Sequence, residues 1–162
     1  MTAPNDRPRD ARAEILYNTD ESRVSRYGPT LADSLNAIGD STGLTNAERE
    51  QRLSEFAELF DDAQLTPDQG ARLLGIVARH AATPASDEQV QGWTTRSRQL
   101  LRERYGADAE RRLETVREFV KARPFLKPYL DSSGVGSHED WLTMLAENAH
   151  LLRMQPKKKE GT

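Results

Sequence analysis

The chain has 162 residues, a formal net charge of −3, 30% charged residues, and only 36% hydrophobic and 6% aromatic residues. Because the sequence contains no cysteine, disulfides and thiolate metal sites are excluded. The low apolar content predicts either an elongated helical protein without a large core or a protein that buries surface against partners. The mixed charges provide no general attraction to nucleic acid or to a membrane surface.

The sequence shows neither a secretory signal nor a membrane span. Its first residues are polar and lack the apolar centre of a signal peptide. No apolar run approaches the roughly 20 residues that cross a bilayer. We therefore expect a soluble protein that works in the compartment where it is made.

Residues 1–29 are predicted to form a flexible arm, since they combine three prolines with scattered charges. The apolar cluster within this arm is Ile15, Leu16 and Tyr17. Two interpretations remain open for it: a short motif that docks on a partner, or part of a disordered tail.

Residues 30–82 are predicted to form a helical N-terminal part. Leu31, Leu35 and Ile38 have the spacing of one short helix, which Gly39 would end.

Capping boxes predict the starts of three further helices. In this motif a Ser or Thr hydroxyl and the side chain three residues later each bind the other's backbone N–H. The pairs are Thr45 with Glu48, Thr66 with Gln69, and Ser86 with Gln89.

Residues 83–153 are predicted to form a helical C-terminal module. Gly106 fits the end of one helix and Asp108 the cap of the next. Residues 125–130 form a short turn-like helix that Pro128 interrupts. No apolar alternation of the strand type competes with these patterns, so the prediction is an all-α fold of about five to six helices.

The last helix, at about residues 138–153, begins after a glycine-containing turn. Ser137 and Asp140 fit a capping box there. The apolar stripe of this helix is predicted to be a helix-packing face. Its members are Trp141, Leu142, Leu145 and Leu152.

Several patterns that suggest chemistry are better explained structurally. The turn at residues 134–137 lacks the lysine of a phosphate-binding loop, and no strand is predicted before it. The three histidines lack the spacing of a helical zinc site. Adjacent carboxylates at residues 61–62 and 139–140 fit exposed helix ends rather than an acid–base pair. We expect no metal, no cofactor, no small-molecule substrate and no enzymatic activity.

Two basic regions remain as candidate binding elements. The arginines of residues 101–117 alternate with carboxylates, which is typical of an ion-paired surface, so we do not expect nucleic acid as a partner. Residues 154–162 form a basic tail, and the predicted partner-binding residues are Arg153, Lys157, Lys158 and Lys159. A purely solubilising tail is the alternative.

One family resemblance extends this interpretation. "LRERYGADAERRLETVREFV" and the later "LDSSGVGSHEDWLTMLAENAHLL" resemble the C-terminal helical half of scaffolding (capsid assembly) proteins of tailed bacteriophages. "LTPDQGARLLGIVARHA" is similar to the helix that commonly precedes this half. The chain departs from the pattern in its short N-terminal arm and in Glu139, where the family usually has proline. The residues that carry the resemblance are Tyr105, Gly106, Leu130, Gly134, Gly136, Ser137 and His138.

The resemblance implies a non-enzymatic protein that associates with itself and binds phage coat or another head protein through charged terminal elements. It also implies a location in the host bacterial cytoplasm and in the procapsid or virion. A second hypothesis is a phage-encoded adaptor or inhibitor that docks on a host or virion protein through Ile15–Tyr17. A helical nucleic-acid-binding protein is a third, weaker one.

Overall fold

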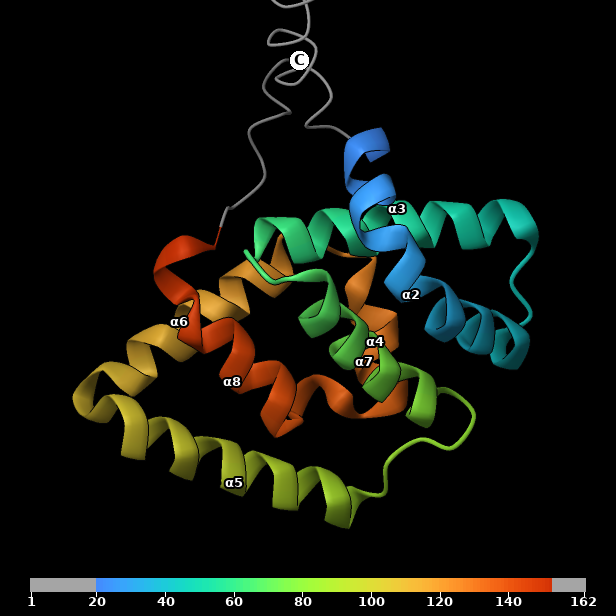
Figure 1. Cartoon of the computed structure of the whole chain (residues 1–162). Helices are drawn as coiled ribbons and strands as arrows, with labels where there is room; N and C mark the ends of the chain where they lie inside the picture. Colours follow the sequence, from blue (N-terminus) through green and yellow to red (C-terminus); the bar gives the residue numbers. More distant parts are fainter. Residues whose placement is uncertain (1–19, 153–162) are drawn as a thin grey trace, which may run out of the picture.

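The computed structural model describes residues 20–152, and every regular element in that range is a helix (Figure 1). This confirms the all-α prediction. The α-helices are α2 (Asp20–Thr42), α3 (Asn46–Asp62), α4 (Pro67–Ala81), α5 (Asp87–Tyr105), α6 (Ala109–Lys121), α7 (Leu126–Ser133) and α8 (Glu139–Glu147). Short 3₁₀ turns occupy Gly106–Asp108, Val135–Ser137 and Ala149–Leu151. None of the helices between residues 20 and 152 has the length and apolar character needed to cross a membrane.

The three predicted capping boxes are confirmed. Thr45, Thr66 and Ser86 each accept a hydrogen bond from the backbone N–H three residues later, and the reciprocal bonds are present. Pro67 occupies the first turn of α4, where the missing N–H costs nothing. Local sequence therefore determines where α3, α4 and α5 begin.

The predicted boundary of the arm at residue 29 is wrong, because α2 already begins at Asp20 and contains Pro29. Tyr27 is fully buried and its hydroxyl donates to the carbonyl of Leu65 at 2.6 Å. Leu31 is also fully buried. A proline within a helix removes one backbone hydrogen bond. Burial of the side chains on either side of Pro29 offsets that loss.

The predicted helix end at Gly39 is also wrong. The helix continues to Thr42, and Gly43, with φ of +75°, follows it. Gly39 instead allows the guanidinium of Arg49 to approach, since a Cβ at this position would lie 2.6 Å from Arg49 Cζ. Arg49 donates to the carbonyl of Leu44 at 3.2 Å and thereby fastens the turn between α2 and α3.

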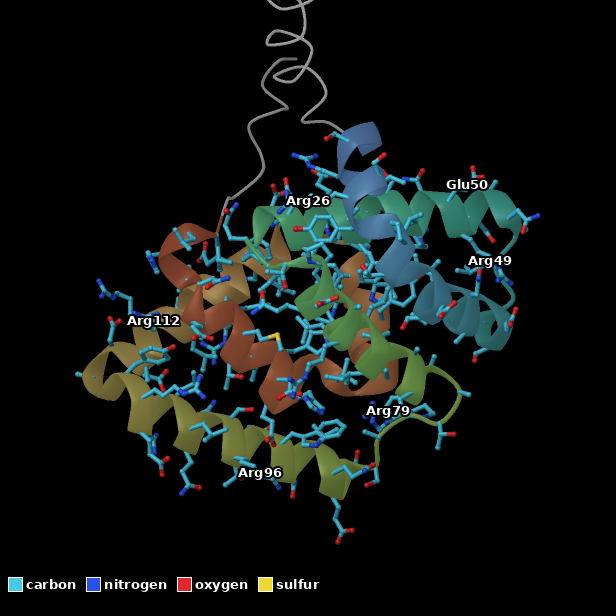
Figure 2. The ribbon with its side chains drawn as sticks, in the orientation of Figure 1. Arg26, Arg49, Glu50, Arg79, Arg96 and Arg112 are labelled. Carbon is cyan, nitrogen blue, oxygen red and sulfur yellow. The ribbon has the colours of Figure 1, made fainter. Side chains whose placement is uncertain are left out.

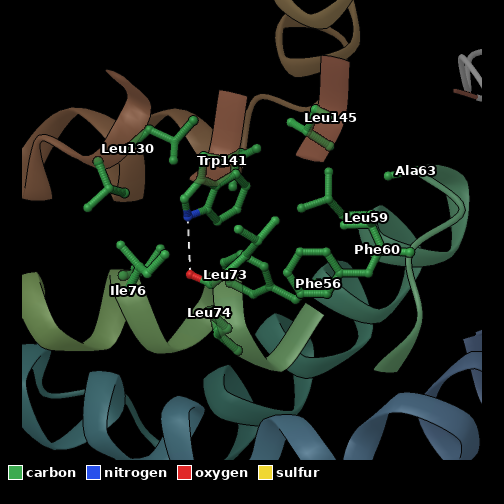
Figure 3. Packing of buried hydrophobic residues seen from close by; sticks show 14 of the residues in the cluster. Phe56, Leu59, Phe60, Ala63, Leu73, Leu74, Ile76, Leu130, Trp141 and Leu145 are labelled. Atoms are coloured by element: carbon green, nitrogen blue, oxygen red, sulfur yellow. Dashed lines mark hydrogen bonds between the residues drawn. The ribbon is translucent and has the colours of Figure 1, made fainter. Parts of the chain in front are cut away.

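The helices surround one continuous cluster of buried hydrophobic residues, which is a larger core than the composition led us to expect. It joins the two predicted helical parts, because the rings of Phe60 and Trp141 lie 6.2 Å apart. Trp141 of α8 lies over α4 and donates from Nε1 to the carbonyl of Leu73 at 3.1 Å (Figure 3). Residues 30–82 and 83–153 are therefore not structurally separate.

Three further details of the C-terminal half differ from the sequence prediction. α7 continues through Pro128, which lies in its first turn. Asp108 makes no side-chain cap, because its carboxylate binds Arg111 and Arg112 instead. The last α-helix ends at Glu147, earlier than the predicted residue 153.

Candidate protein-binding surfaces

The predicted helix-packing residues of α8 pack inside this chain. Trp141 and Leu145 are each 2% exposed, and Leu142 and Leu152 are partly buried against the core. The stripe therefore packs against α4 through Trp141 and against α5 and α6. It is not an open surface for a second molecule.

The predicted partner-binding residues lie outside the described residues. These are Arg153, Lys157, Lys158 and Lys159, and the same holds for the apolar cluster Ile15–Tyr17. The structure does show where both terminal segments join the fold.

Both ends of the described chain meet at the C-terminal end of α3. Near the start of α2, Arg23 Nε donates to Asp61 Oδ2 at 3.2 Å. Near the last described residues, Asn148 Nδ2 donates to the carbonyls of Ala63 and Gln64 at 3.0 and 3.2 Å. The segments that precede residue 20 and follow residue 152 are thus attached to one side of the molecule.

A buried ion-pair cluster fixes this meeting point. Asp62 and Arg123 are each 5% exposed, and Arg123 Nη2 donates to Asp62 Oδ2 at 2.8 Å. The guanidinium also lies over the ring of Phe119 at 3.8 Å and donates to its carbonyl at 2.9 Å. Burial lowers the pKa of Arg123, and the hydrogen bond to Asp62 opposes that shift. The pair joins the ends of α3 and α6, so the carboxylate of Asp62 has a structural role.

This ion pair could not be predicted from sequence spacing. Asp62 and Arg123 are separated by 61 positions in the chain. Asp62 lies between Asp61 and Ala63, and Arg123 lies between Ala122 and Pro124, and no local pattern marks either as buried.

A groove of about 380 Å³ lies beside this cluster, between α3 and the connection from α6 to α7. Its walls combine apolar groups with carboxylates. The lining residues are Glu55, Glu58, Leu59, Ala122, Arg123, Pro124 and Phe125.

The glycine-containing turn before α8 is a packing element. Gly134 has φ of +82°, and a Cβ there would lie 3.1 Å from side-chain atoms of both Ala85 and Val90. The backbone N–H of Ala85 donates to the carbonyl of Ser133 at 3.0 Å. This contact ties the connection between α4 and α5 to the end of α7.

His138, not Ser137, is the N-cap of α8, so the predicted Ser137–Asp140 capping box is wrong. Ser137 lies in the preceding 3₁₀ turn, and its carbonyl accepts from Ser97 Oγ at 3.2 Å. The ring of His138 lies 4.7 Å from that of Trp93. Burial lowers the pKa of His138, while the carboxylates of Asp140 and Glu139 favour its protonated form.

The C-terminal half of α5 carries four exposed arginines along its length, with Arg98 and Arg102 on one face and Arg96 on the side that meets α8. Arg96 pairs with Glu139 at 3.0 Å. Arg98, Arg102 and Arg104 are exposed and form no ion pair with any residue between 20 and 152. We call Arg96, Arg98, Arg102 and Arg104 the α5 arginine row.

Other arginines on this side of the molecule have partners. Arg112 donates to Asp108 at 2.8 Å and to the carbonyl of Ala146 at 2.8 Å, and its guanidinium lies over the ring of Tyr105. Figure 2 shows Arg96 on α5 and Arg112 near the turn from α5 to α6. The structure thus separates arginines that hold helices together from arginines that remain available to a partner.

The remaining surface offers few other candidates. Leu151 is the large hydrophobic side chain that is exposed among residues 20–152. In the same range, no three His, Cys, Asp or Glu side chains are grouped as metal ligands.

Searches of protein-family models, of curated proteins and of solved structures found no match to this chain.

Proposed function

We propose that this chain is a non-enzymatic protein-binding domain that acts as a scaffolding-type head-assembly protein of a tailed bacteriophage. In this role it associates with itself and guides coat protein in the host cytoplasm, within the growing procapsid. The resemblance of residues 90–153 to such proteins supports the proposal.

The observation that carries the proposal is the α5 arginine row. It presents four exposed guanidinium groups, of which Arg96 is paired with Glu139, and Glu103 is the one carboxylate within residues 96–104 of the helix. Exposed charges of one sign attract an acidic surface and accelerate encounter, and salt weakens the contact. An assembly factor must bind and then be released, and electrostatic contacts of this kind permit both.

The basic tail adds further positive charge to that of the α5 arginine row. Arg153 and the three lysines at 157–159 carry four positive charges against Glu160. We propose that they contact an acidic surface of coat protein, as the α5 arginine row does.

Coat-assembly experiments test the proposal. Purified coat protein of the encoding phage is assembled with and without this chain, and the products are followed by light scattering, sedimentation and electron microscopy. We expect the chain to co-sediment with coat at low salt, to be released at high salt, and to increase the yield of closed shells.

Charge-reversal and truncation variants test which surface of the chain binds coat protein. We expect Arg98→Glu/Arg102→Glu to lose co-sedimentation while Lys121→Glu/Lys127→Glu, which reverses two other exposed charges, retains it. Removal of residues 154–162 should weaken binding and its salt dependence without changing helicity. Coat assembly that is indifferent to the chain would contradict the proposal. Capture of one host protein from lysate in place of coat would instead favour the adaptor hypothesis.

A further inference from the structure

One long face of α5 is exposed. On its other face the helix packs against α6, α8 and the short 3₁₀ turns at residues 106–108 and 135–137. Of the 19 residues in α5, the buried ones are Ser97 and Leu101. The helix runs along one edge of the molecule (Figure 1). Its exposed face is therefore accessible to a second molecule along the length of the helix.

Two features of this face lower the stability of α5 in the isolated chain. Arg98 and Arg102 lie one turn apart, so their like charges repel. Gly92 lies in the interior of the helix, where glycine is less favourable than alanine. A Cβ at Gly92 would meet nothing within 4 Å, so no contact within residues 20–152 requires a glycine there. A partner helix that brings carboxylates close to this face would offset both features.

The charges of the exposed face are complementary to those of the same face in a second copy. Glu88, Thr95 and Arg102 are exposed and seven residues apart, about two helical turns, so they lie in one line. Neither Glu88 nor Arg102 forms an ion pair with a residue between 20 and 152. Two antiparallel copies of α5 that cross at Thr95 place each Glu88 opposite the other copy's Arg102.

We infer that α5 pairs with α5 of a second copy of this chain, antiparallel and centred on Thr95. Thr95 and Gly92 have small side chains, which allow the two helices to approach closely. The contact is polar and its ion pairs are exposed, so it is weak and sensitive to salt.

This pairing assigns a surface to the self-association within the proposed function, and it rests on that function to this extent. It also connects self-association with coat binding. A second copy and an acidic coat surface compete for Arg102, so coat protein that binds the α5 arginine row separates the paired helices.

Disulfide trapping tests the pairing, because the chain has no native cysteine. The test variant is Thr95→Cys, whose two copies meet at the symmetry axis. The matched control is Gln91→Cys, which is also exposed and lies one turn away on α5. In the antiparallel pair Gln91 lies opposite Gln99 of the second copy, so two cysteines at position 91 are about 12 Å apart along the helix. A disulfide requires Cα atoms within about 7 Å.

We expect mild oxidation to give a disulfide-linked dimer several-fold faster from Thr95→Cys than from Gln91→Cys. Random collision would give equal rates, and a parallel pair would link both positions rapidly. Either result would overturn the inference. Circular dichroism verifies that each variant retains its helices. No coat protein takes part, so the outcome is separate from that of the coat-assembly experiment.

Exchange of the two charges tests the ion pairs. In the Thr95→Cys background, Arg102→Glu and Glu88→Arg should each slow dimer formation several-fold, because each places like charges opposite one another. The double variant Glu88→Arg/Arg102→Glu restores opposite charges at an unchanged net charge, so it should recover the parent rate. High salt should reduce the differences among these variants. A double variant as slow as either single variant would overturn the proposed register.

Discussion

The Nδ1 atom of His138 accepts a hydrogen bond at 3.0 Å from the backbone N–H of Asp140, and the imidazole thereby caps α8. An imidazole that accepts at Nδ1 carries its proton at Nε2. A doubly protonated ring has no acceptor, so the cap exists only while His138 is neutral. The helix that it caps carries Trp141, which ties α8 to α4.

Acidification should therefore destabilise the protein through His138. Burial lowers the pKa of His138 in the folded state, and nearby His80 and Arg79 act in the same direction, against Asp140 and Glu139. As pH falls, the unfolded chain takes up this proton first. The stabilisation is fully present above the unfolded pKa of about 6.5 and is lost as pH falls from there through the folded pKa. Urea denaturation at pH 7.5 and 5.5 should show lower stability at the lower pH.

His138→Asn provides the control for this prediction, because asparagine caps a helix without titrating in this range. The variant should retain most of the stability at pH 7.5 and lose less of it on acidification. His138→Ala should cost about 1 kcal/mol at pH 7.5 through loss of the cap. An identical pH dependence in the wild type and His138→Asn would refute the assignment.

Gly134→Ala should destabilise the fold through a local clash, whereas Gly106→Ala should do so through backbone strain. Gly134 has φ of +82° and ψ of 1°, in the left-handed region that other residues enter at a cost of about 1 kcal/mol. A Cβ there would also lie 3.1 Å from side-chain atoms of Ala85 and Val90. Gly106 has φ of +55° and ψ of −125°, outside that region, and a Cβ there meets nothing within 4 Å. We expect each variant to lower the free energy of unfolding by about 1 to 3 kcal/mol. A loss at Gly134 of about 1 kcal/mol or less, measured by urea denaturation, would show that the contact with Ala85 and Val90 relaxes freely.

Trp141→Phe should remove the hydrogen bond to Leu73 while leaving an aromatic ring in the core. We expect the free energy of unfolding to fall by about 1 to 2 kcal/mol, because the hydrogen bond is lost and the ring is smaller. Trp141→Ala should cost about 3 to 5 kcal/mol, because the cavity between α4 and α8 cannot close fully. Calorimetry measures both losses. Trp93→Phe is the comparison, because the ring of Trp93 is only partly buried. If Trp141→Phe lowered the free energy of unfolding less than Trp93→Phe does, Trp141 would not be central to the core.

The parts of the fold that the sequence predicts are those determined within one helical turn. The capping boxes at Thr45, Thr66 and Ser86 are of this kind, since both partners lie three residues apart. The assignment of Pro29 to the arm and of Gly39 to a helix end is wrong because their tolerance in α2 depends on distant contacts, of Tyr27 with Leu65 and of Gly39 with Arg49.

The same limit applies to the candidate binding surfaces. Periodicity predicts the apolar stripe of α8, but only the fold shows that α4, α5 and α6 cover it. The arginines near residues 101–117 are alike in sequence, yet Arg112 is bound to Asp108 and Ala146, and Arg102 has no ion pair with a described residue. The sequence identifies which residues carry charge, whereas the packing of the helices determines which charged side chains remain exposed to a partner.

The Asp62–Arg123 pair provides the clearest comparison between buried and exposed charges. Asp62→Asn should cost about 3 kcal/mol or more, because it leaves the guanidinium of Arg123 buried without its carboxylate. Asp131→Asn removes the exposed partner of Lys127 and should cost less than about 0.5 kcal/mol. The double variant Asp62→Leu/Arg123→Met should recover much of the first loss, since it removes both charges from the interior. A double-mutant cycle by urea denaturation measures this coupling. If Asp62→Asn were no more costly than Asp131→Asn, the pair would not stabilise the junction of α3 and α6.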